Sequence, residues 1–140
     1  MIKCMNWPVG VCSWSLRNDL DELNKLRKKT SIDCMHLDIT PALDGPGKAF
    51  IEQFAVAEWK FSAAMVGFAQ EDYSTLDSIK LTGGVAPDSC WIQNRDRVFK
   101  AIDLTASMGL NYLEFHCGFI DEPGSESFKR LADKMFCLLE

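Results

Sequence analysis

The segment Cys34-Met35-His36-Leu37-Asp38-Ile39 discriminates between two α/β architectures. Side chains of a β-strand point alternately to its two faces, so His36 and Asp38 share one face and apolar side chains share the other. A doubly wound sheet is covered by helices on both faces, which requires apolar residues on both. A (β/α) barrel instead accepts polar side chains at the carboxyl ends of its strands, where barrels carry their functional residues. The alternation therefore favours a parallel barrel.

Three more segments are predicted strands, and they repeat this asymmetry. Their ranges are Val9–Ser15, Lys60–Met65 and Tyr112–His116. Alternation assigns an apolar, helix-facing set, which is Val9, Val11, Phe61, Ala63, Met65, Leu113 and Phe115. The opposite, inward set is Gly10, Cys12, Trp14, Ser62, Ala64, Tyr112, Glu114 and His116. Because the inward set becomes polar toward the carboxyl ends, the four strands together predict one polar rim.

Helical segments alternate with these strands. The predicted helices are Asp19–Lys29, Lys48–Glu58, Ser74–Lys80, Cys90–Met108 and Glu126–Leu139, with a loop at Pro41, Gly45, Pro46 and Gly47. Alternation of this kind predicts a parallel sheet with right-handed crossovers. A full (β/α)8 barrel takes about 250 residues, so four βα units in one domain, residues 1–140, correspond to a half barrel of the TIM type. On pattern alone, a flavodoxin-like sheet with strand order 2-1-3-4-5 remains the alternative.

The composition is that of an ordinary globular protein, with 47% hydrophobic residues, 25% charged residues and a net charge of −5. An acidic chain is a poor nonspecific partner for nucleic acid or for an anionic membrane. No segment approaches the ~20 apolar residues of a membrane span, and the N-terminus has no secretory apolar region, so we expect a cytoplasmic protein. None of the six cysteines has Cys-x-x-Cys spacing. We expect buried, reduced thiols rather than disulfides or a zinc cluster.

The candidate site residues lie at the predicted rim. His36 and Asp38 stand two residues apart at the end of the second strand, and His116 stands at the end of the fourth. Imidazoles and carboxylates that converge on one rim suit divalent-metal binding or proton transfer at a sugar carbon. Trp14, at the end of the first strand, could form a wall for an apolar substrate face.

Structural roles remain open beside these functional ones. A histidine at a strand end is often a hydrogen-bonded structural residue, Asp38 could cap the following loop, and Trp14 could belong to the core. Glu114 is expected to be structural, and Lys60 on the next strand is a possible partner for it, because an unpaired buried carboxylate is costly. In Thr82-Gly83-Gly84, a helix stop is favoured over an anion-binding loop.

Three segments resemble the sugar phosphate isomerase/epimerase family. They are Val9–Ser15 (VGVCSWS), Thr75–Asp88 (TLDSIKLTGGVAPD) and Tyr112–Phe119 (YLEFHCGF). That family has the xylose-isomerase-like TIM-barrel fold, which it shares with the endonuclease-IV-type nucleases. The resemblance extends in order over nearly the whole chain, and it identifies the chain with the N-terminal half of such a barrel.

The resemblance implies a metal-dependent enzyme that isomerises or epimerises a sugar, sugar phosphate or polyol. A divalent ion (Mn²⁺, Mg²⁺, Co²⁺ or Zn²⁺) polarises the substrate oxygens in such enzymes. The family's metal ligands, Glu, Asp, His and Glu, come from later strands, so we expect this chain alone to bind no metal. By the resemblance, His116 lines the substrate pocket, and His36 occupies a second-strand position of more variable role. The expected partner is a small carbohydrate.

Other functions remain as alternatives. Without the metal ligands, the isolated chain is expected to be inactive as a monomer, and it could instead be a non-catalytic half-barrel interaction module or an inert fragment. An endonuclease-IV-like nuclease is disfavoured, because the third strand ends Met65-Val66-Gly67 without the rim histidine that such a metal cluster needs.

A half barrel has two open sheet edges, and open edges invite pairing. We therefore predict that the isolated chain self-associates through them. Light scattering at high protein concentration measures this directly, and a monodisperse monomer would contradict it.

Overall fold

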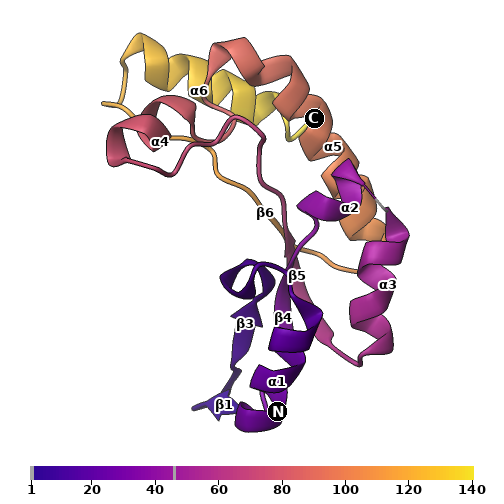
Figure 1. Cartoon of the computed structure of the whole chain (residues 1–140). Helices are drawn as coiled ribbons and strands as arrows, with labels where there is room; N and C mark the ends of the chain where they lie inside the picture. The colour runs from indigo at the N-terminus through magenta and orange to yellow at the C-terminus, as the bar shows by residue number, and fades with distance from the viewer. Residues whose placement is uncertain (1, 46) are drawn as a thin grey trace. The chain divides into compact units, whose positions relative to one another are not determined.

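The chain is described by a computed structural model that covers residues 2–45 and 47–140, so Pro46 of the predicted loop lies outside the described residues. The structure contains a parallel sheet of four strands in the order β3-β4-β5-β6 (Figure 1). The strands are β3 (Gly10–Cys12), β4 (Cys34–Asp38), β5 (Lys60–Met65) and β6 (Leu113–Glu114). Neighbouring strands of this sheet are also consecutive strands of the chain, as in a (β/α) barrel. The flavodoxin-like order 2-1-3-4-5 is wrong for this sheet.

The chain divides into two compact units. The first comprises Met1–Val66 and Leu104–Glu114 and contains the whole parallel sheet. The second comprises Gly67–Asp103 and Phe115–Glu140 and is mainly helical. The expectation of a single domain over residues 1–140 stays a prediction.

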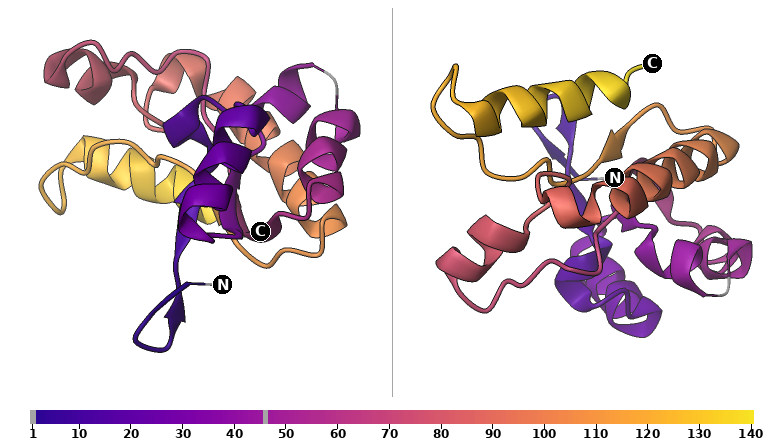
Figure 2. Two further views of the ribbon diagram at one scale, coloured as in Figure 1. Left: turned by 60° about the horizontal axis from the view of Figure 1, so that its bottom comes forward. Right: turned by 90° about the horizontal axis from the view of Figure 1, so that it is seen from above.

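A small hairpin that the sequence did not predict precedes the parallel sheet. Its strands are β1 (Lys3–Cys4) and β2 (Trp7–Pro8), which pair antiparallel. Met5 adopts a positive φ of 55° at the reversal. Figure 2 (left) shows the hairpin leading into β3.

Four helical segments belong to the first unit. They are η1 (Ser13–Leu16), α1 (Leu20–Thr30), α2 (Thr40–Asp44) and α3 (Lys48–Val56). The predicted first strand is too long, because η1 replaces its last residues. The predicted loop at Pro41 is also wrong, because Pro41 lies in the first turn of α2, where its missing N–H costs nothing.

The start of α1 is confirmed. The Asp19 carboxylate accepts hydrogen bonds from the backbone N–H groups of Asp21 and Glu22, at 3.0 and 3.1 Å. An aspartate at this position satisfies amides that have no partner inside the helix and complements the helix dipole.

A β-bulge changes which side chains of β5 face the helices. The pairing of β4 with β5 shifts in the middle of the strands, and Ser62 is the extra residue. Beyond it, Ala64 pairs with Leu37 on the helix-facing side and is completely buried. Ala63 and Met65 pair instead with the site residues of β4. The predicted alternation is therefore reversed for residues 63–65, because one inserted residue turns the rest of a strand over.

The core of the first unit lies between the sheet and its helices. Leu23 of α1 and Phe54 of α3 are fully buried, as are the helix-facing residues of β4. The second unit contains α4 (Leu76–Thr82), η2 (Asp88–Cys90), α6 (Glu126–Cys137) and most of α5 (Trp91–Ser107), the last turn of which belongs to the first unit. The buried apolar cluster of the second unit is Phe68, Val85, Val98, Leu131 and Leu138.

The cysteines and the hydrophobicity of the helices bear on two of the expectations from sequence. All six cysteines are free, but only Cys34 is buried, so the expectation of uniformly buried thiols is wrong. No helix in the described part of the chain is both long enough and apolar enough to cross a bilayer.

Candidate functional site

In the first unit, His36 is the centre of a cluster at the end of β4. Its ring lies edge-on to Trp14, with centroids 5.0 Å apart. Its Nδ1 lies 3.4 Å from the Glu114 carboxylate at the end of β6, and its buried Nε2 has no hydrogen-bond partner among the described residues. The sequence placed Trp14, His36 and Glu114 on one face, and the structure brings them together. The predicted pairing of Glu114 with Lys60 is wrong, because Lys60 binds Asp33 at 2.6 Å.

Asp38 is held as a loop anchor. One carboxylate oxygen accepts from the Asn18 side-chain amide and the other from the Thr40 backbone N–H, both at 2.9 Å. The Asp38 backbone N–H donates to the hydroxyl of Ser13, which is fully buried. The bonds to Ser13 and Asn18 hold η1, and with it Trp14, against the end of β4, and the bond from Thr40 holds the segment that follows β4. Asp38 thus makes the contacts of the structural alternative, and its contact with a substrate stays a prediction.

Cys12 is the neighbour of His36 across the sheet. Burial raises the pKa of the Cys12 thiol, and the negative charge of Glu114 raises that pKa further. A raised pKa disfavours the thiolate, which is the nucleophilic form of cysteine. Cys12 is therefore an uncharged thiol that borders this cluster, and it is not activated as a nucleophile.

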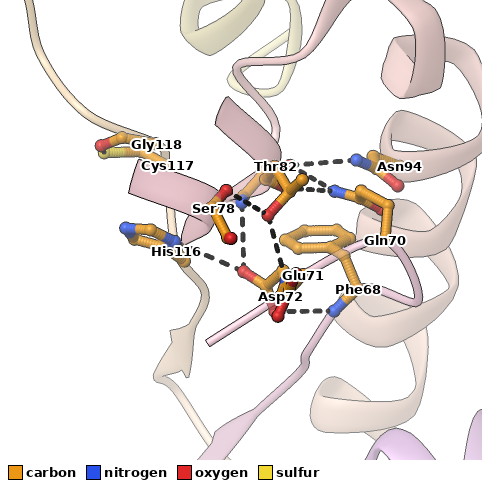
Figure 3. Close-up of polar contacts among 11 residues, drawn as sticks. Phe68, Gln70, Glu71, Asp72, Ser78, Thr82, Asn94, His116, Cys117 and Gly118 are labelled. Carbon is orange, nitrogen blue, oxygen red and sulfur yellow. Dashed lines mark hydrogen bonds and ion pairs between the residues drawn. The ribbon is translucent and has the colours of Figure 1, made fainter. Parts of the chain in front are cut away.

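In the second unit, the polar centre is Glu71, which follows β5 by a short loop (Figure 3). Its side chain is only 7% exposed. One carboxylate oxygen accepts from the Phe68 backbone N–H and the other from the Gly84 backbone N–H, each at 3.0 Å. The second of these oxygens also lies 3.3 Å from Nδ1 of His116. Glu71 and His116 thus form a second imidazole–carboxylate pair, and both residues follow neighbouring strands of the sheet.

The Phe119 ring borders this pair, edge-on to His116, with centroids 5.8 Å apart. Burial raises the pKa of the Tyr73 phenol, and the negative charge of Glu71 raises that pKa further. Tyr73 therefore stays protonated.

The loop that carries Gly83 and Gly84 runs directly against His116. Gly83 ends α4, and its N–H bonds to the Ile79 carbonyl, so the predicted helix stop is confirmed. A Cβ on Gly83 would lie 2.5 Å from the His116 ring, and one on Gly84 would lie 2.0 Å from the His116 carbonyl. The glycines are thus required by close approach as well as by helix termination, since no side chain fits between the loop and His116.

Two side-chain amides tie the same loop in place. Gln70 donates to the Gly84 carbonyl at 2.8 Å and to the Thr82 carbonyl at 3.2 Å, and Asn94 of α5 donates to the Gly84 carbonyl at 3.0 Å (Figure 3). The Val85 N–H donates to the His116 carbonyl at 3.2 Å. Side chains from two elements therefore hold the loop beside His116 in a fixed geometry.

The described residues, 2–45 and 47–140, contain no group of three or more His, Cys, Asp or Glu side chains placed to hold a metal ion. Each histidine has one carboxylate partner, at 3.4 and 3.3 Å. A divalent metal site needs more ligands than this, so the residues present do not fit one. No chemical step is therefore derived through a metal.

Sequence reasoning missed Glu71. A signal was present, because Glu71 lies six residues beyond the end of β5, where the loop at the carboxyl end of a barrel strand carries functional residues. In this region the sequence patterns indicated a role only for the glycines that follow the predicted short helix, Gly83 and Gly84. The acceptor role of Glu71 depends on contacts with residues far along the chain, such as Gly84 and His116, which the sequence does not place.

Comparison with known proteins concerns the fold. The sequence matches no protein-family model and no curated protein sequence. The structure is similar to the crystal structure of a xylose isomerase domain protein from Planctomyces limnophilus, with a TM-score of 0.71 and 17% sequence identity. The similarity covers 95% of this chain and 49% of that chain.

The chain has a xylose-isomerase-like TIM-barrel fold. It spans about half the length of the structure it matches, in agreement with the half barrel predicted from four βα units. At this sequence identity the likeness establishes the fold alone, since one barrel fold serves many functions.

Proposed function

We propose that the chain supplies substrate-binding elements of a carbohydrate isomerase- or epimerase-type barrel. The observation that carries this proposal is the Glu71–His116 pair, a buried carboxylate joined to a more exposed imidazole, in the segments that follow β5 and β6 along the chain. Barrels of this type hold their functional residues in the loops that follow their strands. An oriented imidazole is suited to exchanging protons with hydroxyl groups.

The neighbouring aromatic residues also favour a carbohydrate as the ligand. Sugars present apolar C–H faces together with hydroxyl groups, and sites for them combine aromatic walls with hydrogen-bonding groups. Phe119 supplies such a wall beside His116, and Trp14 supplies one beside His36. Each histidine cluster is thus a candidate contact region for a small polyhydroxylated molecule.

The chain contains two histidines, which allows a direct test. Protein labelled with ¹⁵N-histidine would be titrated with aldoses, ketoses and their phosphates while the imidazole signals are followed by NMR. We expect one class to shift the His116 signals with a Kd of about 1 mM or lower. His116→Asn should weaken binding by about tenfold or more, since a hydrogen bond to the substrate is lost.

Lys129→Ala is the matched control, because Lys129 is an exposed residue of α6 that pairs only with its helix neighbour Glu126. That variant should bind the sugar as the unaltered chain does. If no sugar or sugar phosphate moves either imidazole signal, the proposal is wrong.

Turnover is a separate part of the proposal. The described residues hold no metal-ligand cluster, so the divalent ion of a metal-dependent isomerase would need ligands that they do not supply. We therefore propose that the isolated chain binds sugar without converting it.

The same observation favours a second candidate, a non-catalytic binding module. The two differ in one measurement: sugar conversion in the presence of Mn²⁺, Mg²⁺, Co²⁺ or Zn²⁺ by any assembly that contains this chain. Conversion would argue for the isomerase-type barrel, and binding without conversion in every such assembly would argue for the module.

A further inference from the structure

We propose that Glu71 is a positioning residue, which holds His116 in one tautomer so that its Nε2 exchanges a proton with a carbohydrate hydroxyl. The inference rests on the proposed function for the class of substrate. The tautomer itself is independent of the substrate and can be measured without one.

Glu71 accepts hydrogen bonds at both of its carboxylate oxygens. These oxygens receive the backbone N–H groups of Phe68 and Gly84, and one of them also faces the Nδ1 edge of His116. Backbone amides are donors only, so both oxygens already act as acceptors. A side chain fixed at both oxygens and only 7% exposed has little freedom to turn. Glu71 is therefore a rigid acceptor aimed at His116.

A rigid acceptor dictates where the imidazole carries its proton. A carboxylate that already accepts other hydrogen bonds can only accept from His116, so Nδ1 must be the N–H nitrogen. In the neutral ring, Nε2 then keeps its lone pair. The Nδ1–Oε1 separation of 3.3 Å is slightly long, as such bonds often are before a substrate is bound.

Glu71 and His116 differ in how far they are buried, and this difference assigns each a role. The His116 side chain is 34% exposed, against 7% for Glu71, so the imidazole is the group that a ligand can reach. Gly83 lets the ring sit against the loop, since a Cβ there would collide with its Cε1 and Nδ1. Phe119 borders the ring edge-on. The ring is thus held on one edge and open to a ligand elsewhere.

The other histidine has the opposite arrangement. The carboxylate that His36 faces, Glu114, is 63% exposed, while the His36 side chain is only 19% exposed and its Nε2 is buried. An exposed carboxylate is a weak and mobile partner. His36 therefore lacks both the rigid acceptor and the accessible nitrogen, and it serves as an internal comparison for His116.

The proposed step moves one proton. The lone pair of Nε2 accepts the proton of a substrate hydroxyl, and the electrons of the broken O–H bond remain on the oxygen. The resulting imidazolium is stabilised by the Glu71 carboxylate at Nδ1 and returns the proton to an oxygen of the substrate or product. The step needs no oxidant or reductant, and it fits any polyhydroxylated substrate with a reactive hydroxyl.

The test is the tautomer of His116, read from long-range ¹H–¹⁵N spectra of ¹⁵N-histidine-labelled protein. The spectra would be recorded at about pH 9, well above the usual imidazole pKa of about 6.5. His36→Gln assigns the two rings. We expect Nδ1–H for His116 in the unaltered chain. Glu71→Gln should shift its tautomer ratio toward Nε2–H by about tenfold or more, because a charge-assisted bond is lost.

Two further variants separate positioning from a merely structural role. Glu71→Asp keeps a carboxylate but alters the shape, and it should preserve Nδ1–H better than the isosteric Glu71→Gln does. Glu114→Gln should leave the His116 tautomer unchanged.

Each outcome supports or overturns the inference. An Nε2–H tautomer of His116 in the unaltered chain overturns it, and this reading needs no variant to fold. An unchanged tautomer in folded Glu71→Gln overturns it too. If sugars fail to bind while His116 is in the Nδ1–H form, the proposed function fails and the positioning role of Glu71 stands.

Discussion

Gly84→Ala is expected to lower the free energy of unfolding by about 3 kcal/mol or more. Gly84 has a φ of +67°, a left-handed conformation that costs a residue with a Cβ about 1–2 kcal/mol. The new Cβ would also lie 2.0 Å from the His116 carbonyl oxygen and 2.6 Å from the Gly118 nitrogen. Both are backbone atoms, so the loop or the chain after β6 must move. Urea denaturation followed by circular dichroism measures the change.

Gly124→Ala is the matched control for the backbone term. Gly124 lies in the same unit and has a φ of +89°, but no described atom lies within 4 Å of the position that a Cβ would take there. Its replacement should cost only the conformational term, about 1–2 kcal/mol. Equal losses for the two variants would mean that the loop does not pack against the His116 segment.

Phe54→Ala is expected to cost about 3–5 kcal/mol in the first unit. Phe54 is completely buried on α3, where its ring packs edge-on against Phe50 at 5.2 Å between centroids. Truncation removes apolar surface from the core and leaves a cavity, and both effects destabilise the folded state. The loss is large beside a typical total stability of about 5–15 kcal/mol.

Val56→Ala on the same helix separates this core effect from helix propensity. The Val56 side chain is 82% exposed, so the change should stay within about 0.5 kcal/mol. Urea denaturation of the two variants, under identical conditions, gives the comparison. A Phe54→Ala loss no larger than that of Val56→Ala would show that α3 does not cover the sheet as described.

The two imidazole–carboxylate pairs differ in how far the sequence predicted them. Alternation placed His36 and Glu114 on one face, because side chains of a strand alternate with a period of two residues. The bulge lies in β5, so it does not change the alternation within β4 or β6. The Glu71–His116 pair could not be predicted in this way. Glu71 lies in a loop, where no periodicity applies, and its position is fixed by amides from Phe68 and Gly84.

The bulge at Ser62 shows a second limit. Strict alternation predicted Ala64 on the polar face and Met65 on the helix-facing side. A single extra residue reverses both, and Ala64 is completely buried while Met65 pairs with Asp38. No local residue type in Lys60–Met65 marks this shift, because the choice depends on how β5 pairs with β4. Register is a property of two strands together.

The order and type of the main elements could be read from local sequence patterns alone. The sequence predicted β4, β5 and the longer helices closely, because hydrophobic periodicity and caps such as Asp19 act within a few residues. It also predicted the polar ends of the strands, and hence a half barrel, from residues such as His36 and Asp38.

The contacts of those polar ends arise from packing between segments that are distant in the chain. The tertiary structure turned Asp38 into a loop anchor, left Glu114 beside His36 and joined Glu71 to His116 across 45 residues of chain. The physical reason is that hydrogen-bond partners are selected by distance and direction in space. Those are fixed when separate segments pack together, whereas periodicity and capping are fixed within each segment.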